Sequence, residues 1–368
     1  MTEPTAQDAA MMRRCCELAV SAAGYTAPNP LVGSVIVNAG EIVGEGFHPK
    51  AGEPHAEVFA LRAAEGRTQG ATLYVNLEPC NHLGRTPPCS EAVIRAGIRR
   101  VVIGMEDPNP KASGGIEKLR AAGIEVIVGV EGDRARRLNE AFIHRVVHRR
   151  PFGILKYAMT LDGKIATTTG HSAWVSSPPS RQQVHQLRSR CGAVIVGGNT
   201  VRKDNPNLTS HGQGIGGAFP EDSRNPVRVV MSRRLDLPTE ANLWDQSVAP
   251  TVVMTQVGAD ASVQQAIEAQ GVEVVTFEQL RPAVVMTNLY ERGLLSVLWE
   301  CGGTLAAEAI AQQAVQKVWA FVAPKLIGGA IAPSPIGDLG LETMTEAKLL
   351  KGLQMQAVGD DILIQGYL

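Results

Sequence analysis

Short apolar runs alternate with polar and glycine-containing segments along the whole chain. In the first 150 residues, runs of this kind predict strands at 31–37, 41–46, 71–77, 100–103 and 124–128. Helices are predicted at 55–65, 90–96, 116–122 and 133–148, with Ser90 as a candidate cap and Gly97 as a terminator of the second. This alternation predicts a mixed sheet with helices on both faces, which is a three-layer α/β domain.

A domain boundary is predicted at the basic stretch His148-Arg149-Arg150-Pro151, because a helix usually ends at or before the residue preceding a proline. The two predicted domains comprise residues 1–150 and 151–368. A second α/β alternation follows the boundary, with strands predicted at 154–159, 193–196, 227–231, 251–255, 272–276, 294–299, 317–322 and 360–368. The polar, glycine-rich stretch 210–225 is predicted to be a surface loop.

Length and composition exclude several classes of protein. A chain of 368 residues suits two domains of ordinary size, and its formal net charge of -1 creates no field that attracts nucleic acid or an anionic membrane. No apolar run approaches the ~20 residues that a membrane-spanning helix needs, and the polar N-terminus does not resemble a signal peptide. We therefore expect a cytoplasmic protein that acts on a small molecule, without nucleic-acid or membrane partners.

Residues with metal-ligand chemistry gather in the first domain, in His55-Ala-Glu57, Pro79-Cys80 and Pro87-Pro-Cys89. A catalytic zinc ion takes three protein ligands and leaves one position open. His55 stands at the start of one predicted helix, and Cys80 and Cys89 flank the start of the next. These three side chains are therefore expected to converge on one ion, and helix N-termini favour the thiolate that binds metal. The other four cysteines are interpreted as buried apolar residues.

Glu57, two positions after His55, is predicted to shuttle protons rather than to bind the metal. Zinc lowers the pKa of the water that it binds to about 7, and a neighbouring carboxylate can pass a proton from that water to a departing amine. Zinc-dependent base deaminases carry this His-x-Glu and Pro-Cys pattern. The alternative is a structural zinc site closed by a fourth ligand, for which His82 is the candidate. The loop between the two cysteines is longer than in the general pattern and is a candidate substrate lid.

Further segments extend the pattern. The first domain contains Pro28-Asn-Pro-Leu-Val-Gly-Ser-Val-Ile-Val37, Gly52-Glu-Pro-His-Ala-Glu57, Pro79-Cys-Asn-His-Leu-Gly-Arg-Thr-Pro-Pro-Cys89 and Asp107-Pro-Asn-Pro110. The second contains Leu155-Lys-Tyr-Ala-Met-Thr-Leu-Asp-Gly163, Ser172-Ala-Trp174, Gly197-Gly-Asn-Thr200 and Pro324-Lys-Leu-Ile-Gly-Gly329. Together these segments resemble the bifunctional riboflavin-biosynthesis deaminase/reductase family. The likeness runs from about Met11 to the C-terminus.

This resemblance implies two successive reactions. The first domain would hydrolyse the 2-amino group of 2,5-diamino-6-(5-phosphoribosylamino)pyrimidin-4-one, with zinc on His55, Cys80 and Cys89 and with Glu57 as proton shuttle. The second domain would use NADPH to reduce the ribosyl side chain to ribityl. The implied folds are a cytidine-deaminase-like three-layer α/β domain and a dihydrofolate-reductase-like α/β domain. The expected assembly is a homo-oligomer.

The resemblance also implies site residues outside the zinc pattern. Those implied to contact NADPH are Ala158, Trp174, Thr200, Asp204, Ser232, Gly302 and Gly303. Those implied to contact substrate are Ser172, Arg188, Leu208, His211 and Glu300 in the second domain and Asn29 and Asn109 in the first. Asn29 and Asn109 are equally well explained as Asn-Pro turn residues. Arg188 offers a bidentate grip on phosphate, but His211 stands where the family more often carries arginine.

The residues of the second domain support cofactor chemistry in their own right. None of its glycine motifs fits the pattern of a Rossmann site, yet the turns at Gly197-Gly198 and Gly302-Gly303 suit backbone contacts to phosphate. Ser232-Arg-Arg234 is a candidate seat for a 2'-phosphate, which favours NADPH over NADH. Hydride addition also needs a proton donor, and we favour Asp204 over Lys156 for that role.

Three other interpretations remain open from sequence alone. A monofunctional deaminase with a non-catalytic C-terminal domain would release ammonia but would oxidise no NADPH. A structural zinc module would be unaffected by Glu57→Gln. A deaminase of nucleic-acid bases is disfavoured by the near-neutral charge and by the lack of a basic surface with interleaved aromatic residues.

Overall fold

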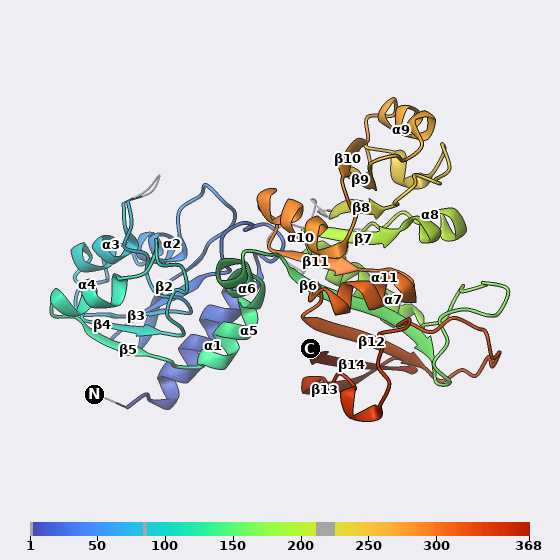
Figure 1. Cartoon of the computed structure of the whole chain (residues 1–368). Helices are drawn as coiled ribbons and strands as arrows, with labels where there is room; N and C mark the ends of the chain where they lie inside the picture. Colours follow the sequence, from blue (N-terminus) through green and yellow to red (C-terminus); the bar gives the residue numbers. More distant parts are fainter. Residues whose placement is uncertain (1–2, 84–86, 211–224) are drawn as a thin grey trace. The chain divides into compact units, whose positions relative to one another are not determined.

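The computed structural model describes residues 3–83, 87–210 and 225–368. Within them, the chain forms two compact units that divide between Arg149 and Arg150 (Figure 1). The surface loop predicted at 210–225 lies almost wholly outside the described residues. In the part of the chain that is described, none of the helices combines the length and the apolar character needed to cross a bilayer.

The first unit contains a five-stranded mixed sheet with the order β2-β1-β3-β4-β5. Its strands are β1 (Gly33–Asn38), β2 (Glu41–Phe47), β3 (Thr72–Val75), β4 (Arg100–Ile103) and β5 (Glu125–Val128). Strand β1 runs antiparallel to both β2 and β3, whereas β3, β4 and β5 are parallel. Each of the five strands predicted from the sequence overlaps one of these strands.

Helices cover both faces of this sheet (Figure 1). They are α1 (Ala6–Val20), α2 (Ala56–Ala63), α3 (Cys89–Arg95), α4 (Gly115–Ala121), α5 (Gly132–Leu138) and α6 (Glu140–His148). On one face, Met12 of α1 packs with Val35 and Val102 of the sheet. On the other, Ala60 of α2 packs with Leu73, in a cluster that also includes residues of α3 and α4. The expected three-layer α/β fold is thus confirmed.

Three local predictions for this unit differ from the structure. The helix predicted at 133–148 is broken at Asn139, whose side chain leaves the helix to accept from Leu31 N and donate to Leu31 O. The predicted Ser90 cap is wrong, because α3 already begins at Cys89 and the Ser90 hydroxyl donates to Asn81 Oδ1. Helix α1 was not predicted, although Thr5 caps it in a capping box with Asp8.

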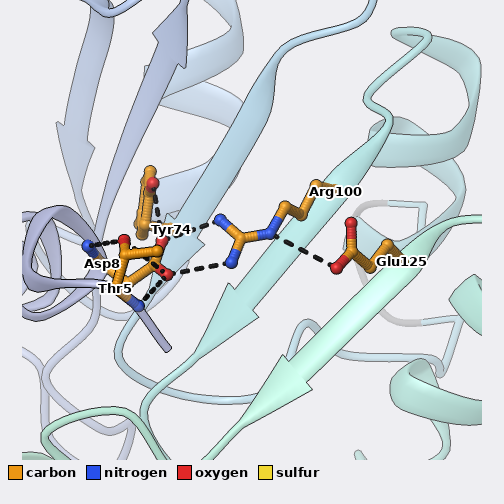
Figure 2. A network of polar contacts seen from close by, with 5 residues as sticks. All are labelled: Thr5, Asp8, Tyr74, Arg100 and Glu125. Atoms are coloured by element: carbon orange, nitrogen blue, oxygen red, sulfur yellow. Dashed lines mark hydrogen bonds and ion pairs between the residues drawn. The ribbon is translucent and has the colours of Figure 1, made fainter. Parts of the chain in front are cut away.

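A buried ion pair ties α1 to the sheet (Figure 2). Asp8 is 1% exposed and accepts hydrogen bonds from Arg100 Nη1 at 2.7 Å and Nη2 at 2.9 Å. The Tyr74 hydroxyl donates to the same carboxylate, and Glu125 lies 3.7 Å from Arg100 Nε. The Arg100 guanidinium holds the pKa of Asp8 well below its ordinary value, despite burial. Burial raises the pKa of Tyr74 to about 12.

The second unit contains a nine-stranded sheet with the order β10-β9-β8-β7-β11-β6-β12-β14-β13. Its strands are β6 (Phe152–Thr160), β7 (Ala193–Gly197), β8 (Val227–Met231), β9 (Thr251–Gln256), β10 (Glu273–Phe277), β11 (Ser296–Trp299), β12 (Lys317–Ala323), β13 (Lys351–Val358) and β14 (Asp361–Tyr367). Strands β6 to β12 run parallel, and β14 runs antiparallel to both of its neighbours. Strand β13 was missed in the sequence, although Leu353, Met355 and Ala357 alternate there with Gln354 and Gln356; most of its residues are exposed.

Helices again pack on both sheet faces. They are α7 (Pro178–Arg190), α8 (Gly198–Asp204), α9 (Ala261–Glu268), α10 (Pro282–Glu291) and α11 (Gly303–Ala311), with 3-10 turns η1 (Asn242–Trp244) and η2 (Met344–Glu346). Residues of α10 and α11 share one apolar cluster with the central strands. Val184 of α7 packs with Phe321 and Leu363 in another. Because the central strands are parallel, their carboxyl ends meet at one sheet edge, where α/β proteins usually bind ligands.

Candidate active sites

In the first unit, His55, Cys80 and Cys89 form a three-ligand cluster. The His55 Nδ1 atom lies 3.5 Å from Cys80 Sγ and 3.3 Å from Cys89 Sγ. All three ligand atoms lie within 4.8 Å of one another. Zinc bonds of ~2.0 Å to nitrogen and ~2.3 Å to sulfur at tetrahedral angles separate such ligands by roughly 3.5 Å. The donor set and its spacing therefore fit a zinc ion.

The three zinc ligands lie on different segments of the chain. His55 is the N-cap of α2, Cys80 follows β3, and Cys89 is the first residue of α3. The Cys89 amide donates to Cys80 Sγ at 3.5 Å, so the turn at the start of α3 draws the two sulfurs together. His82 is exposed and is not part of the cluster. Among the described residues, the site thus has three protein ligands, as a catalytic zinc site requires.

The two sulfurs differ in proton affinity. A hydrogen bond from the Cys89 thiol lowers the pKa of Cys80 to about 4, with His55 adding to the effect. The pKa of Cys89 is raised, because its proton is shared with Cys80 and because the side chain is buried. Cys80 therefore loses its proton more readily than an ordinary thiol, and thiolate is the form that binds metal.

Glu57 lies in the first turn of α2, beside the zinc ligands. Its side chain is 3% exposed, and burial raises its pKa to about 7, although His55 acts in the opposite direction. Its Oε2 atom is buried and has no hydrogen-bond partner among the described residues. An orphaned buried carboxylate oxygen is costly, and it suits a group that exchanges a proton with a ligand.

Asn29 is held beside this cluster by His48, which was not singled out in the sequence. The buried His48 ring donates from Nδ1 to the Pro54 carbonyl at 3.0 Å, because a carbonyl can only accept. Its Nε2 atom then accepts from Asn29 Nδ2 at 3.0 Å. These bonds orient the side-chain amide of Asn29. The His48 ring packs edge-on against the His55 ring, with 5.4 Å between the ring centroids.

Asn109 belongs to a segment that packs against the same cluster. Ala112 of this segment lies in one apolar group with Cys80 and Cys89. The backbone N–H of Asn109 donates to Asp107 Oδ1 at 2.8 Å, and this bond fixes the turn that carries both residues. Burial raises the pKa of Asp107 to about 6, and the neighbouring Cys80 adds to the effect.

In the second unit, a largely buried charge cluster lies at the carboxyl end of β11, with its side chains 10–18% exposed. Glu300 accepts from Arg188 Nε at 2.6 Å and Nη2 at 3.0 Å, and Lys156 Nζ lies 3.7 Å away. Burial alone would raise the pKa of Glu300, but Arg188 and Lys156 outweigh it and lower the pKa to about 2. Burial lowers the pKa of Lys156. The Arg188 edge expected to grip phosphate thus faces Glu300.

Of the candidate substrate contacts in this unit, Leu208 lies next to a residue that contacts the charge cluster. Arg188 Nη1 donates to the Thr209 carbonyl at 3.0 Å, next to the buried Leu208. Ser172 and Trp174 lie on an exposed segment, and the Arg181 guanidinium stacks 4.6 Å from the Trp174 ring centroid. His211 lies outside the described residues.

Candidate NADPH contacts follow the ends of neighbouring parallel strands. Thr200 and Asp204 lie on α8 after β7, Ser232 follows β8, and Gly302 is the N-cap of α11 after β11. Ala158 lies on β6, next to β11 in the sheet, and Gly303 opens α11. A Cβ at Gly302 would meet nothing within 4 Å, so the backbone there is open to a ligand.

Two polar groups in this region have partners that the sequence did not reveal. The Ser232 hydroxyl donates to Asp236 Oδ1 at 3.2 Å, and Arg233 pairs with Glu308 at 2.8 Å. Asp204 is exposed, yet partial desolvation still raises its pKa. The following residue, Asn205, accepts two 2.8 Å hydrogen bonds from Asn242, one at its side-chain oxygen and one at its carbonyl, and these fix the end of α8.

Two family models match the chain. Residues 151–364 match the RibD C-terminal domain, and residues 5–105 match the cytidine and deoxycytidylate deaminase zinc-binding region. These two matches lie on either side of the division between the two compact units.

Relatives match over nearly the whole chain. The riboflavin biosynthesis protein RibD of Synechocystis is 61% identical over 362 residues, which are 98% of this chain and 96% of that protein. The protein of the same name from Aquifex aeolicus is 42% identical and covers 96% of each. A solved diaminohydroxyphosphoribosylaminopyrimidine deaminase/5-amino-6-(5-phosphoribosylamino)uracil reductase from Thermotoga maritima is 37% identical, with a TM-score of 0.86 over 98% of both chains. Acinetobacter baumannii RibD, form 1, is 36% identical with a TM-score of 0.85.

Proposed function

This chain belongs to the bifunctional riboflavin-biosynthesis deaminase/reductase family, and on that premise we propose which of its residues carry each reaction. It is a zinc-dependent hydrolase and an NADPH-dependent oxidoreductase in one polypeptide. We assign the deaminase to residues 1–150 and the reductase to residues 151–368, in accord with the two compact units. A monofunctional deaminase is not favoured, because the match to the RibD C-terminal domain spans the second unit.

The deaminase assignment rests chiefly on the orphaned Glu57 carboxylate beside a three-ligand cluster. His55, Cys80 and Cys89 would hold zinc, which when bound makes water acidic enough to attack carbon at neutral pH. Glu57, with a pKa of about 7, takes a proton as water adds to C2 of the pyrimidine and returns it to the amino group. Ammonia then leaves, and the ring carbonyl remains. Asn29 and Asn109 would contact the ring or its substituents.

The reductase assignment rests on the charge cluster of Lys156, Arg188 and Glu300 at the carboxyl ends of parallel strands. Glu300 and Arg188 would hold the ribose side chain, together with Ser172, Leu208 and His211. Ala158, Trp174, Thr200, Ser232, Gly302 and Gly303 would contact NADPH, which when bound would supply the hydride. Asp204, whose pKa is raised, would donate the accompanying proton.

Lys156 is a second candidate for the proton donor. Its ammonium lies 3.7 Å from Glu300, and burial lowers its pKa, so that it releases a proton more readily than an exposed lysine. If Asp204 is the donor, Asp204→Asn should be impaired in NADPH oxidation; if Lys156 is the donor, Lys156→Met should be.

We also propose a cytoplasmic homo-oligomer that binds neither nucleic acid nor membranes. The net charge of -1 supports the absence of polyanion binding. Self-association is supported by β13, which has one strand neighbour and exposes Leu353 and Met355. Sedimentation of the double variant Leu353→Lys/Met355→Lys tests this: a monomeric variant of an oligomeric parent supports a second copy on β13, and an unchanged size contradicts it.

One assay tests both activities together. The diaminopyrimidine phosphate is supplied with NADPH, and ammonia and nicotinamide absorbance are followed in the same sample. Ammonia release followed by NADPH oxidation is expected. Removing zinc with a chelator should stop ammonia release but leave oxidation intact when deaminated intermediate is supplied, and added zinc should restore the first step. Ammonia release without NADPH oxidation would contradict the bifunctional assignment.

A further inference from the structure

A buried carboxylate, Glu78, lies directly before the zinc-ligand turn at Pro79-Cys80. It is 5% exposed, and its hydrogen bonds come from three backbone amides. Oε1 accepts from Gly114 N at 2.9 Å and from Ile116 N at 3.1 Å, and Oε2 accepts from Asp107 N at 3.1 Å. Amide donors of this kind stabilise a carboxylate that water does not reach.

These three bonds anchor both ends of one segment. Asp107 stands at its beginning, and Gly114 joins it to α4 at its end. Between them lies Asn109, which the proposed function places in contact with substrate. Backbone bonds run alongside, from Glu78 N to Met105 O and from Asn81 N to Ala112 O, each 2.9 Å long. The segment is therefore fastened to the turn that carries Cys80.

The start of α4 approaches the same turn so closely that only glycine fits. A Cβ at Gly115 would overlap the Pro79 carbonyl oxygen, and Gly114 has a left-handed φ of 96°. Glu78 pairs with the backbone amides at this close approach, of which the Ile116 N–H is buried and the Gly114 and Asp107 N–H groups are partly buried. The carboxylate thus joins the zinc-ligand turn to the segment bearing Asp107 and Asn109 by side-chain hydrogen bonds.

We propose that Glu78 is a positioning residue that sets the affinity of the deaminase site for its pyrimidine substrate. It acts by holding the amide of Asp107, and so the Asp107–Asn109 turn, at a fixed place beside Cys80. It touches neither the metal nor the substrate. The inference rests on the proposed role of Asn109, and the experiment below distinguishes failure of one from failure of the other.

Glu78→Gln is the sharpest variant, because it separates the three bonds. A glutamine that keeps its carbonyl oxygen in place of Oε1 retains the bonds from Gly114 and Ile116. Its amide nitrogen then replaces Oε2 and faces the Asp107 N–H, so that donor meets donor. The opposite orientation loses two bonds instead of one. The variant therefore releases the Asp107 end while α4 stays in place.

The measurement is ammonia release as a function of substrate concentration, together with zinc content and reductase activity. For Glu78→Gln we expect KM to rise about ten-fold, with kcat changed less than about three-fold and zinc retained. NADPH oxidation with supplied intermediate should be unchanged, which provides a control within the same chain. An unchanged KM, or a loss of rate that simply follows lost zinc, overturns the proposal.

Two further comparisons keep the test decisive. Asn109→Ala should raise KM if that residue contacts substrate. If KM rises in Asn109→Ala but not in Glu78→Gln, only the positioning role of Glu78 is contradicted. If KM changes in neither variant, the assignment of Asn109 to the substrate site is contradicted. If Glu78→Gln does not fold, Asp107→Pro and Asp107→Ala are compared, since both remove the side chain but only proline removes the N–H. A higher KM for the proline variant supports the proposal, and equal values contradict it.

Discussion

Arg188 and Glu300, 112 positions apart in the chain, meet through two parallel hydrogen bonds of 2.6 and 3.0 Å. One side chain comes from α7 and the other from the end of β11. Burial would by itself favour a neutral Glu300, so the carboxylate is ionised because Arg188 and Lys156 lie beside it. The arginine therefore determines the charge of the site as well as its shape.

Replacing Arg188 should make the reductase sensitive to acid. In the wild type the pKa of Glu300 is about 2, so this carboxylate stays charged throughout pH 5–8. In Arg188→Met, burial is no longer opposed by the guanidinium and the pKa of Glu300 rises. The rate of NADPH oxidation should fall at least about ten-fold at pH 6 and recover partly toward pH 8. Arg188→Lys keeps a positive charge but not the two parallel hydrogen bonds. Its rate of NADPH oxidation at pH 6 should therefore lie between those of the wild type and Arg188→Met.

Asp204→Asn should slow NADPH oxidation when deaminated intermediate is supplied, by roughly a hundred-fold, if Asp204 donates the proton. Ammonia release in the same preparation should be unaffected. Lys156→Met is the comparison. A normal rate in Asp204→Asn with a large loss in Lys156→Met would transfer the proton-donor role to the lysine.

Glu57→Gln should lower ammonia release by roughly a thousand-fold while zinc stays bound, because the amide cannot exchange a proton but has the same shape. Metal analysis and the ammonia assay on one sample check both parts. Reductase activity serves as the control for folding. Loss of zinc in this variant would mean that Glu57 supports the metal site, and full ammonia release would exclude Glu57 as the proton shuttle.

Asp8→Asn should lower the free energy of unfolding of the first unit by about 3 kcal/mol at pH 7, because the largely buried Arg100 loses its bidentate carboxylate partner and keeps only Glu125 at 3.7 Å. The pKa of Asp8 lies below its unfolded value of 3.8, so this contribution is complete above about pH 5. It is lost as the pH falls through 3.8 and below. Urea unfolding at pH 7 and pH 3 measures the difference, and an equal gap between variant and wild type at both values would contradict the argument.

The chemistry of the zinc site could be predicted from sequence, because the types and the spacing of its residues are characteristic of that chemistry. A histidine and a glutamate two positions apart at a helix start, and two cysteines beside the next helix, restrict the geometry strongly. The strands other than the exposed β13 were recognised for a similar reason, since most of them are buried apolar runs. Their boundaries shifted by only a few residues.

Contacts made across the fold could not be predicted in this way. Nothing in the order of residues brings His48 to Asn29 or Glu78 to Gly114, since these pairs depend on how loops approach one another. Asn139 breaks a helix to satisfy Leu31, more than a hundred positions away. The pairing of Arg188 with Glu300 could not be seen in the sequence either, which indicated only that Arg188 is a candidate phosphate ligand.

The contact between Gly115 and the Pro79 carbonyl has an evolutionary consequence. Any side chain at position 115 would push the start of α4 away from the cysteine turn, and no rotamer could avoid the clash because it arises at Cβ. Chains descended from a common ancestor that retain this turn should therefore keep glycine at this position even where the rest of the helix has diverged. A homologue with a larger residue there is one in which the neighbouring loop must have been rebuilt.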